Sequence, residues 1–189
     1  MKHLLLLLSF ILFTPFIYAK TPTPPNILWI VGENFSLDLA CYGQKNVRTP
    51  NLDRLAKEGT RYTKVYSTSP VCAPSRSALM TGWYATTTDM HHMRSHRTDG
   101  WRLPAGVRPI THLLKDAGYH TANITHIGKR IGKRIVGTGK LDLNFAAEGL
   151  VYAGKNWADL KIKQPFFAQI YCASFGVQNH RVAFVVTLF

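Results

Sequence analysis

The sequence predicts an α/β fold in which a mostly parallel sheet is flanked by helices. Continuous apolar runs at residues 26–31 and 165–172 have the composition of strands buried in a parallel sheet. Between them, a helical pattern over residues 109–117 is followed at once by an alternating segment over residues 119–127. A helix that connects strands in this order is typical of parallel sheets. The chain has 189 residues, enough for one sizeable core, so we expect one domain or part of one.

The N-terminal segment is predicted to lie outside this domain. A positively charged start, an apolar run over residues 4–13 and a plausible cleavage position at Ala19 make residues 1–19 typical of a secretory signal peptide. The apolar run is too short to span a bilayer. We therefore expect a periplasmic or secreted protein with no stable membrane anchor after cleavage. A proline-rich linker at residues 20–25 then precedes the domain at residues 26–189.

The chain is basic, with a formal net charge of +13. An exported basic protein suits an anionic polymer or a small anion as its ligand. We expect no nucleic-acid partner, because the Lys and Arg residues are spread along the chain without a DNA- or RNA-binding motif, and export argues against it. The cysteines Cys41, Cys72 and Cys172 are too few and too odd in number for a disulfide framework. One pair could form, which would leave a third thiol with a role of its own.

The first third of the domain continues the alternation of strands and helices. The run at residues 26–31 is followed by Gly32 and then by Glu33 and Asn34, so polar side chains lie where open α/β sheets place their ligands. A helix is predicted from Thr49, as N-cap, and Pro50 to its end at Gly59. Residues 61–67 alternate enough to predict a strand that leads into the next helix.

Residues 71–82 predict a short helix with a reactive cysteine at its N-terminus. Their sequence is Val-Cys-Ala-Pro-Ser-Arg-Ser-Ala-Leu-Met-Thr-Gly. Pro74 suits a first helical turn and Gly82 a helix end, which places Cys72 just ahead of the helix. Free backbone N–H groups and the helix dipole favour a thiolate there, and they also favour a bound oxyanion. Arg76, about one turn further on, can donate two hydrogen bonds to the same anion. The alternative is a buried cysteine that caps a core helix.

Residues 89–97 are rich in histidine and arginine. His91, His92 and His96 do not form a specific zinc pattern. A solvated basic loop is one interpretation of this segment. The other is that His91 and Arg94 line the mouth of an anion pocket and contact the substrate.

Two motifs carry a family resemblance. Cys-x-Pro-Ser-Arg followed by Ser-x-Leu-x-Thr-Gly at residues 72–82, and Thr-Pro-Asn-Leu-Asp-Arg-Leu at residues 49–55, resemble the type I sulfatases, whose cysteine is oxidised to formylglycine. A tyrosine-phosphatase loop would need Cys-x5-Arg, and position 78 is Ala78. The His-His-Met-Arg run at residues 91–94 is similar to that of some sulfatases that act on sulfated glycans, which suggests a heparan N-sulfatase-like subgroup.

The resemblance covers about residues 26–180 and implies an alkaline-phosphatase-like sulfatase fold, incomplete at its C-terminus. In this family a sulfate-binding lysine follows the strand that corresponds to residues 119–127. Lys140, in Gly-Thr-Gly-Lys-x-Asp, is the better match, and Lys129 is the alternative by its distance from the strand. A histidine also follows a later strand and contacts the sulfate, and His180 is the candidate here.

The resemblance also implies calcium, held by Glu33, Asn34 and the modified Cys72. The family has two acidic residues where this chain has Glu33 and Asn34, so the pair carries one negative charge instead of two. The formylglycine hydrate presents two hydroxyls, of which one attacks sulfur and the other later collapses to expel sulfate. Arg76 would orient this group and the anion.

The implied function is that of a sulfuric ester hydrolase. It would release sulfate from a sulfated glycan or a related small sulfate ester, after a maturation enzyme has generated formylglycine at Cys72. One alternative is a truncated, catalytically inactive sulfatase-like chain that at most binds sulfated glycans. A third hypothesis is a phosphate or phosphonate ester hydrolase of the same superfamily.

Overall fold

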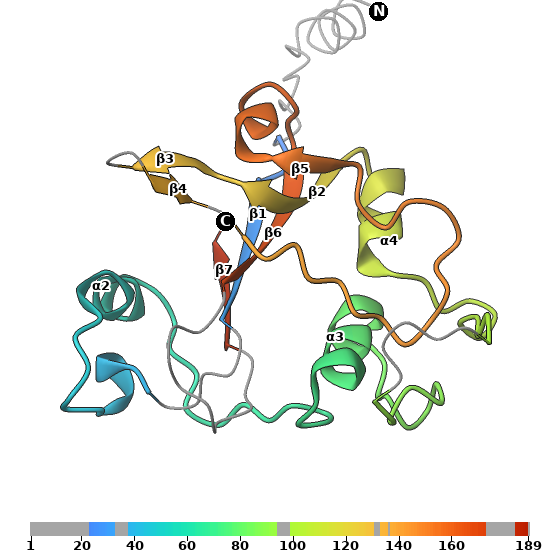
Figure 1. Ribbon diagram of the computed structural model, residues 1–189, viewed down its shortest axis with the longest axis horizontal. Helices are drawn as coiled ribbons and strands as arrows, with labels where there is room; N and C mark the ends of the chain where they lie inside the picture. The colour runs from blue at the N-terminus through green and yellow to red at the C-terminus, as the bar shows by residue number, and fades with distance from the viewer. Residues whose placement is uncertain are drawn as a thin grey trace, which may run out of the picture.

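The central element of the computed structural model is a five-stranded sheet with the order β5-β2-β6-β1-β7 (Figure 1). The structure describes residues 23–32, 38–93, 99–130, 133–135, 137–172 and 184–188. Four strands are parallel, and β7 pairs antiparallel with β1, which confirms the predicted fold class. The strands are β1 (Ile27–Gly32), β2 (His120–His126), β5 (Gly154–Asn156), β6 (Phe166–Cys172) and β7 (Phe184–Leu188).

The register brings the carboxyl ends of β1 and β6 to the same edge of the sheet. Val31 pairs with Tyr171, and Gly32 pairs with Cys172. On the other side of β6, Asn123 of β2 pairs with Gln169. Because ligands of open α/β sheets bind beyond the carboxyl ends of the strands, this edge is the expected place for a functional site.

Helices lie beside this edge and beside the sheet (Figure 1). The helix α3 begins at Cys72 and is buried along one broad side. Its C-cap is Gly82, whose φ of 71° is the left-handed conformation that favours glycine. By contrast, α2 has no buried residue, and it lies with η1 apart from the sheet. The helical elements are η1 (Ala40–Tyr42), α2 (Pro50–Glu58), α3 (Cys72–Thr81), α4 (Ile110–Asp116) and η2 (Trp157–Lys161).

Two apolar clusters hold the described part of the chain together. The first joins β2, β6 and η2, and its buried members are Ala122, Ile124, Leu160, Ala168 and Ile170. The second lies beyond α3 and consists of Ala85, Met90 and Phe145, with Trp101 and Leu103 packed against it. The second cluster fixes the loop after α3 against the segment that follows residue 140. Both segments carry predicted site residues.

Most of the predicted elements are present with boundaries that differ by one or two residues. The predicted strands at 26–31, 119–127 and 165–172 correspond to β1, β2 and β6. The first four residues of β1 are only half-buried, so this strand is less enclosed than its apolar sequence predicts. The prediction of a strand at 61–67 is wrong. This segment is exposed, because alternation creates a strand only where a neighbouring strand is available to pair with it.

Some details of the remaining elements differ from expectation. Thr49 occupies the N-cap position of α2, but its hydroxyl donates to the Asp53 carboxylate at 3.0 Å and accepts the N–H of Ala40 at 3.1 Å, and it caps no backbone N–H group of α2. The sequence Gly-Lys-Arg occurs twice between residues 128 and 134. In this region β3 (Gly128–Arg130) pairs antiparallel with β4 (Lys133–Ile135). The predicted signal peptide at 1–19 lies outside the described residues. Among the residues that the structure describes, no helix has the length and apolar character needed to cross a membrane.

Candidate anion-binding site

Cys72 is the first residue of α3, one position further into the helix than the sequence predicts. Val71 is the N-cap, with φ −131° and ψ 145°, and its carbonyl oxygen accepts the N–H of Ser75 at 3.0 Å. The Cys72 thiol is half-buried and makes no disulfide. Cys72 thus lies at the N-terminus of the helix. The first N–H groups of a helix have no acceptor within it, and the helix dipole favours negative charge at this end.

Arg76 lies one turn along α3 and is buried, with only 5% of its surface exposed. Its guanidinium carbon is 4.1 Å from the centroid of the Tyr171 ring on β6, a cation–π geometry. Burial lowers the pKa of Arg76, while Tyr171 and Asp142 oppose this change. An arginine keeps its charge in proteins, so α3 holds a permanent cation close to the carboxyl end of β6.

Tyr171 of β6 contacts the Arg76 guanidinium, and nearby charges affect the pKa of its hydroxyl. Burial raises the pKa of its hydroxyl, the Arg76 charge lowers that pKa, and Asp142 and Cys72 raise it further. Of these three groups, Arg76 is in direct contact with the Tyr171 ring. The hydroxyl is neutral at neutral pH, since its pKa is raised from an ordinary value of about 10.

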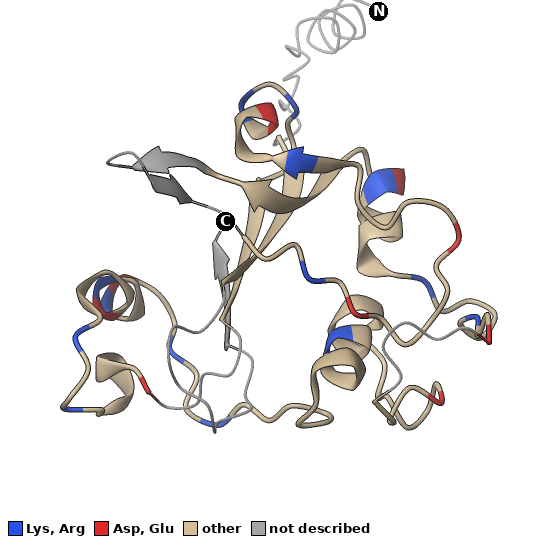
Figure 2. Cartoon of the chain, in the orientation of Figure 1, with Lys and Arg blue, Asp and Glu red and all other residues tan. Residues whose placement is uncertain are grey.

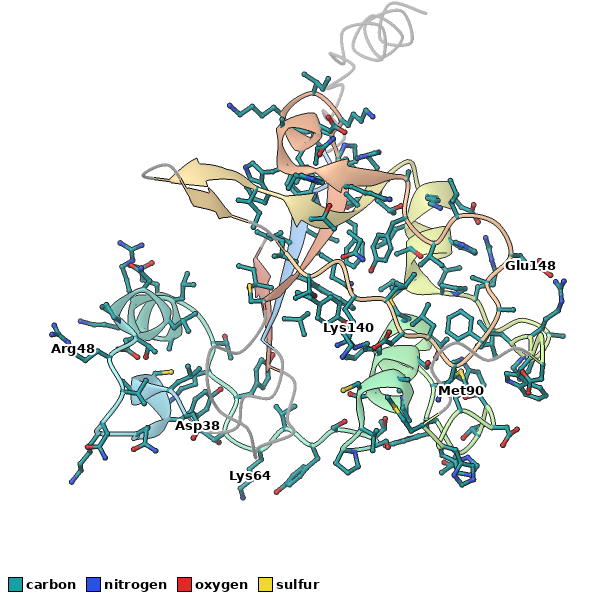
Figure 3. All side chains as sticks on the ribbon, viewed as in Figure 1. Asp38, Arg48, Lys64, Met90, Lys140 and Glu148 are labelled. Carbon is teal, nitrogen blue, oxygen red and sulfur yellow. The ribbon has the colours of Figure 1, made fainter. Side chains whose placement is uncertain are left out.

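Lys140 enters this region from a turn that is held by two strands. Its ammonium nitrogen is 3.3 Å from a carboxylate oxygen of Asp142. The preceding turn is fixed because the N–H of Thr138 donates to the Tyr171 carbonyl at 2.9 Å, and the Asn123 side chain donates to the Gly139 carbonyl at 2.9 Å. Figure 3 shows Lys140 on the segment that passes beside α3. The structure thus holds the turn before Lys140 against β2 and β6, and the same segment reaches α3 through Asn144.

The turn before Lys140 requires a glycine at position 137. A Cβ atom there would lie 2.2 Å from the carbonyl oxygen of Ile124, much closer than carbon and oxygen atoms can approach. Strand β2 and the turn are therefore in direct backbone contact. This close packing is what places Lys140 at the sheet edge, and it explains physically why the Gly-Thr-Gly-Lys sequence begins with glycine.

The alternative lysine lies elsewhere. Lys129 belongs to β3, where it pairs with Arg134 of β4, and the hairpin extends away from the sheet (Figure 1). Lys140 is thus the lysine that lies beside Asp142, on the segment that contacts α3, although its role in sulfate binding stays a prediction. The predicted site residues Glu33, Asn34, Arg94 and His180 lie outside the described residues.

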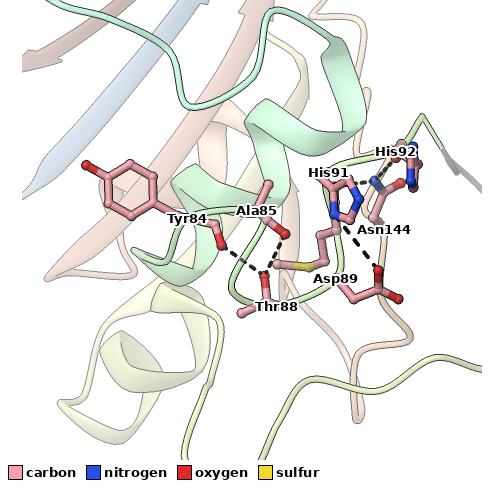
Figure 4. Close-up of polar contacts among 8 residues, drawn as sticks. Tyr84, Ala85, Thr88, Asp89, His91, His92 and Asn144 are labelled. Carbon is pink, nitrogen blue, oxygen red and sulfur yellow. Dashed lines mark hydrogen bonds and ion pairs between the residues drawn. The ribbon is translucent and has the colours of Figure 1, made fainter.

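Asn144 is a buried residue that connects three parts of the site, and the sequence reasoning did not identify it. Its side-chain amide donates to the carbonyls of Met90 at 2.9 Å and His92 at 2.6 Å (Figure 4). Its backbone N–H donates to the Ser77 hydroxyl of α3 at 2.9 Å. Asn144 therefore joins three parts of the chain: residues 89–93, which we call the histidine loop, the helix α3, and the segment that carries Lys140. No local pattern distinguishes it, since all three contacts are distant in sequence.

The histidine loop presents imidazole rings at the surface. The Nδ1 atom of His91 is 3.9 Å from a carboxylate oxygen of Asp89, and the ring centroids of His91 and His92 are 4.1 Å apart. In the part of the chain that the structure describes, no group of three or more His, Cys, Asp and Glu residues could hold a metal ion. Lys and Arg residues are spread over several elements instead of one patch (Figure 2).

Comparison with known proteins identifies the family. The model of the family described as "Sulfatase" matches residues 25–135, more than half of the chain. The chain belongs to the sulfatase family. Among curated sulfatase relatives, it is 36% identical over 163 residues to an ulvan-active sulfatase from Formosa agariphila, covering 79% of this chain. It is 41% identical over 118 residues to the steryl-sulfatase of Mus musculus, covering 58% of this chain. The sulfatase chain described here spans only 25% and 19% of the lengths of these relatives.

Solved structures support the fold. A structure described as a 2-O GAG sulfatase aligns with a TM-score of 0.60 and 20% identity, covering 84% of this chain and 39% of that one. A second structure, in complex with k-i-k-neocarrahexaose, aligns with a TM-score of 0.56 and 22% identity, covering 82% of this chain and 46% of that one. At these identities the alignments establish the sulfatase fold and do not assign a substrate to this sulfatase.

Proposed function

We propose that this sulfatase is a sulfuric ester hydrolase whose nucleophile derives from Cys72. The observation that carries the proposal is the position of Cys72 at the start of α3, one turn before Arg76, with the segment of the Lys140–Asp142 pair held against the same helix and against β6. A helix N-terminus and two cations are suited to a tetrahedral oxyanion. When Cys72 has been oxidised to formylglycine, its hydrate supplies a hydroxyl nucleophile for the sulfur atom.

The described residues would bind and orient the sulfate group. Arg76 provides N–H donors in a fixed plane, which suits two oxygen atoms of one anion. Lys140 provides a compact charge, and its contact with Asp142 keeps its ammonium group at the sheet edge before substrate binds. These cations would stabilise negative charge as the bond from sulfur to the leaving oxygen breaks. His180 remains a further proposed sulfate ligand.

Calcium at Glu33, Asn34 and the modified Cys72 is part of the same proposal. Glu33 and Asn34 directly follow β1, whose last residue pairs with Cys172 at the carboxyl edge of the sheet. Their carboxylate and amide oxygens are ligands that a hard cation accepts. The described part of the chain has no other cluster of acidic, histidine and cysteine residues for a metal.

We propose a sulfated glycan as the substrate class. The relatives of this chain include an ulvan-active sulfatase, and one solved structure of similar fold contains a sulfated glucosamine as its substrate. The formal net charge of +13 favours an anionic polymer. The exposed His91 ring, beside Asp89, would contact the glycan together with Arg94. A heparan N-sulfatase-like specificity is the finer form of this proposal, and it rests on the His-His-Met-Arg run.

Export is part of the proposal as well. Residues 1–19 would direct the chain to the periplasm or the medium, and a formylglycine-generating enzyme would act on Cys72 during maturation. Because Cys72 is half-buried in the folded chain, it would be more accessible to that enzyme before folding is complete.

The test uses the full chain, produced together with a maturation enzyme. Mass spectrometry of the peptide that contains Cys72 should show replacement of the thiol by an aldehyde, and sulfate release from sulfated oligosaccharides should depend on added Ca²⁺. Cys72→Ala should abolish this release, whereas Cys41→Ala, a matched change at a half-buried cysteine, should retain it. Turnover that survives Cys72→Ala would refute the proposal. Faster cleavage of phosphate than of sulfate esters would favour the phosphate ester hydrolase instead. Binding without turnover would favour the inactive chain.

A further inference from the structure

Tyr171 contacts both cationic elements of the candidate site. The face of its ring lies 4.1 Å from the guanidinium carbon of Arg76 on α3. Its backbone carbonyl accepts the N–H of Thr138, in the turn that carries Lys140. Only 4% of its surface is exposed, so the ring is held firmly in the structure. One residue of β6 thus links the helix that begins at Cys72 to the turn that ends at Lys140.

This contact has a physical consequence for Arg76. A free arginine side chain carries about 2 kcal/mol of rotamer entropy, which must be lost when its guanidinium binds an anion in a defined geometry. A ring that packs on the guanidinium removes much of this freedom before the anion arrives. The cation–π attraction also offsets part of the cost of burying the charge. The ring contacts the face of the guanidinium, whereas an anion is bound by the N–H donors in its plane.

We propose that Tyr171 is a positioning residue that holds Arg76 for the bound sulfate group. The proposal rests on the proposed function, because the anion is the sulfate of that site. The aromatic ring carries this role, and the hydroxyl is not required for it. A residue of β6 that lies 95 positions after Arg76 therefore determines how the arginine of the Cys-x-Pro-Ser-Arg motif is presented.

Tyr152 provides a matched control, because it is an aromatic residue whose partners among the described residues are neutral. Its hydroxyl donates to the Gln169 side chain at 2.8 Å and contacts the Met80 sulfur at 3.6 Å. Its ring stacks with Phe167, with centroids 6.5 Å apart. Loss of the Tyr152 ring should therefore destabilise packing near the same sheet without changing the partner of Arg76.

The experiment measures the affinity of the full chain for inorganic sulfate, by calorimetry and by the sulfate-dependent rise in its unfolding temperature. Tyr171→Leu should weaken sulfate binding by about 3- to 30-fold, the range expected for loss of a cation–π contact. Tyr171→Phe should keep the wild-type affinity because the ring remains. Tyr152→Leu should lower the unfolding temperature without sulfate and keep the sulfate affinity.

A second measurement does not depend on folding of the leucine variant. In wild-type protein labelled at arginine, the side-chain protons of Arg76 should be shifted upfield by the Tyr171 ring, with the signals assigned by Arg76→Lys. Sulfate should shift the same signals. Wild-type protein that fails to bind sulfate overturns both the proposed function and the role of Tyr171. Wild-type affinity in Tyr171→Leu, or no upfield shift of Arg76, overturns only the role of Tyr171.

Discussion

Replacement of Asn144 by alanine should strongly destabilise the chain and release the histidine loop. The change removes two side-chain hydrogen bonds, to the carbonyls of Met90 and His92, and leaves these acceptors without that donor. Each hydrogen bond contributes a net stabilisation of about 1 kcal/mol, and the fully buried side chain leaves a cavity when it is removed. Together these effects should lower the free energy of unfolding by about 2–4 kcal/mol. In a chain of this size, that corresponds to a fall of about 5–15 °C in unfolding temperature.

Urea denaturation followed by circular dichroism measures the total effect, and hydrogen exchange locates it. Exchange should increase at residues 90–93, which depend on Asn144. It should change less at residues 84–88, which are held by their own turn contacts, including the Thr88 hydroxyl to the Tyr84 carbonyl at 3.3 Å. Asn51→Ala, at an exposed position of α2, is the control and should change stability by less than about 0.5 kcal/mol. A loss below about 1 kcal/mol for Asn144→Ala, or uniform exchange across the loop, would contradict the reasoning.

Three further predictions follow from the packing and charges. Gly137→Ala should lower the free energy of unfolding by about 1–3 kcal/mol and weaken sulfate binding, because its methyl group meets a β2 carbonyl. Gly149→Ala places its methyl group in open space, at a φ of 69° that disfavours alanine, so it should cost about 1–2 kcal/mol and leave sulfate binding unchanged. Burial lowers the pKa of His120, so the unfolded chain binds more protons than the folded chain below about pH 6.5. The free energy of unfolding should therefore fall as the pH decreases through this range, and His120→Gln should reduce the slope. Arg102→Ala removes an exposed ion pair with Glu148 and should cost less than about 1 kcal/mol in urea denaturation.

Each of these has an outcome that would contradict it. Equal loss of sulfate affinity in the two glycine variants would show that the backbone contact with β2 is not what places Lys140. An unchanged pH slope in His120→Gln would show that this imidazole does not contribute to the pH dependence. A loss of 2 kcal/mol or more on removal of Arg102 would exceed what exposed ion pairs supply.

The parts of the fold that depend on local sequence were predictable. The continuous apolar runs identify β1 and β6, and Pro74 with Gly82 identifies α3, because helix ends and buried strands have residue preferences of their own. The exposed segment at residues 61–67 shows the limit of this reasoning. Its alternation specifies two faces, but the presence of a neighbouring strand is a property of the whole chain.

The candidate site was predictable only where it coincides with short motifs. Cys72 and Arg76 belong to one motif, and the helix that contains them fixes their relative position. The contact of Arg76 with Tyr171 joins α3 to β6, and the contacts of Asn144 join segments that are more than 50 residues apart. Tyr171 appears in the sequence as one more apolar strand residue. Such contacts depend on sheet order and register, which no local pattern encodes.

The hydrogen bond between the Ser77 hydroxyl and the Asn144 backbone sets the rotation of α3 about its own axis. Consecutive residues of an α-helix are about 100° apart around the axis, so the direction in which the buried Ser77 points also determines the directions of Arg76 and Cys72. A chain with an intact Cys-x-Pro-Ser-Arg motif but no partner for this serine could let the helix turn and direct its arginine away from the sheet. The segment around residue 144 is therefore as much a part of the structural requirement as the motif itself.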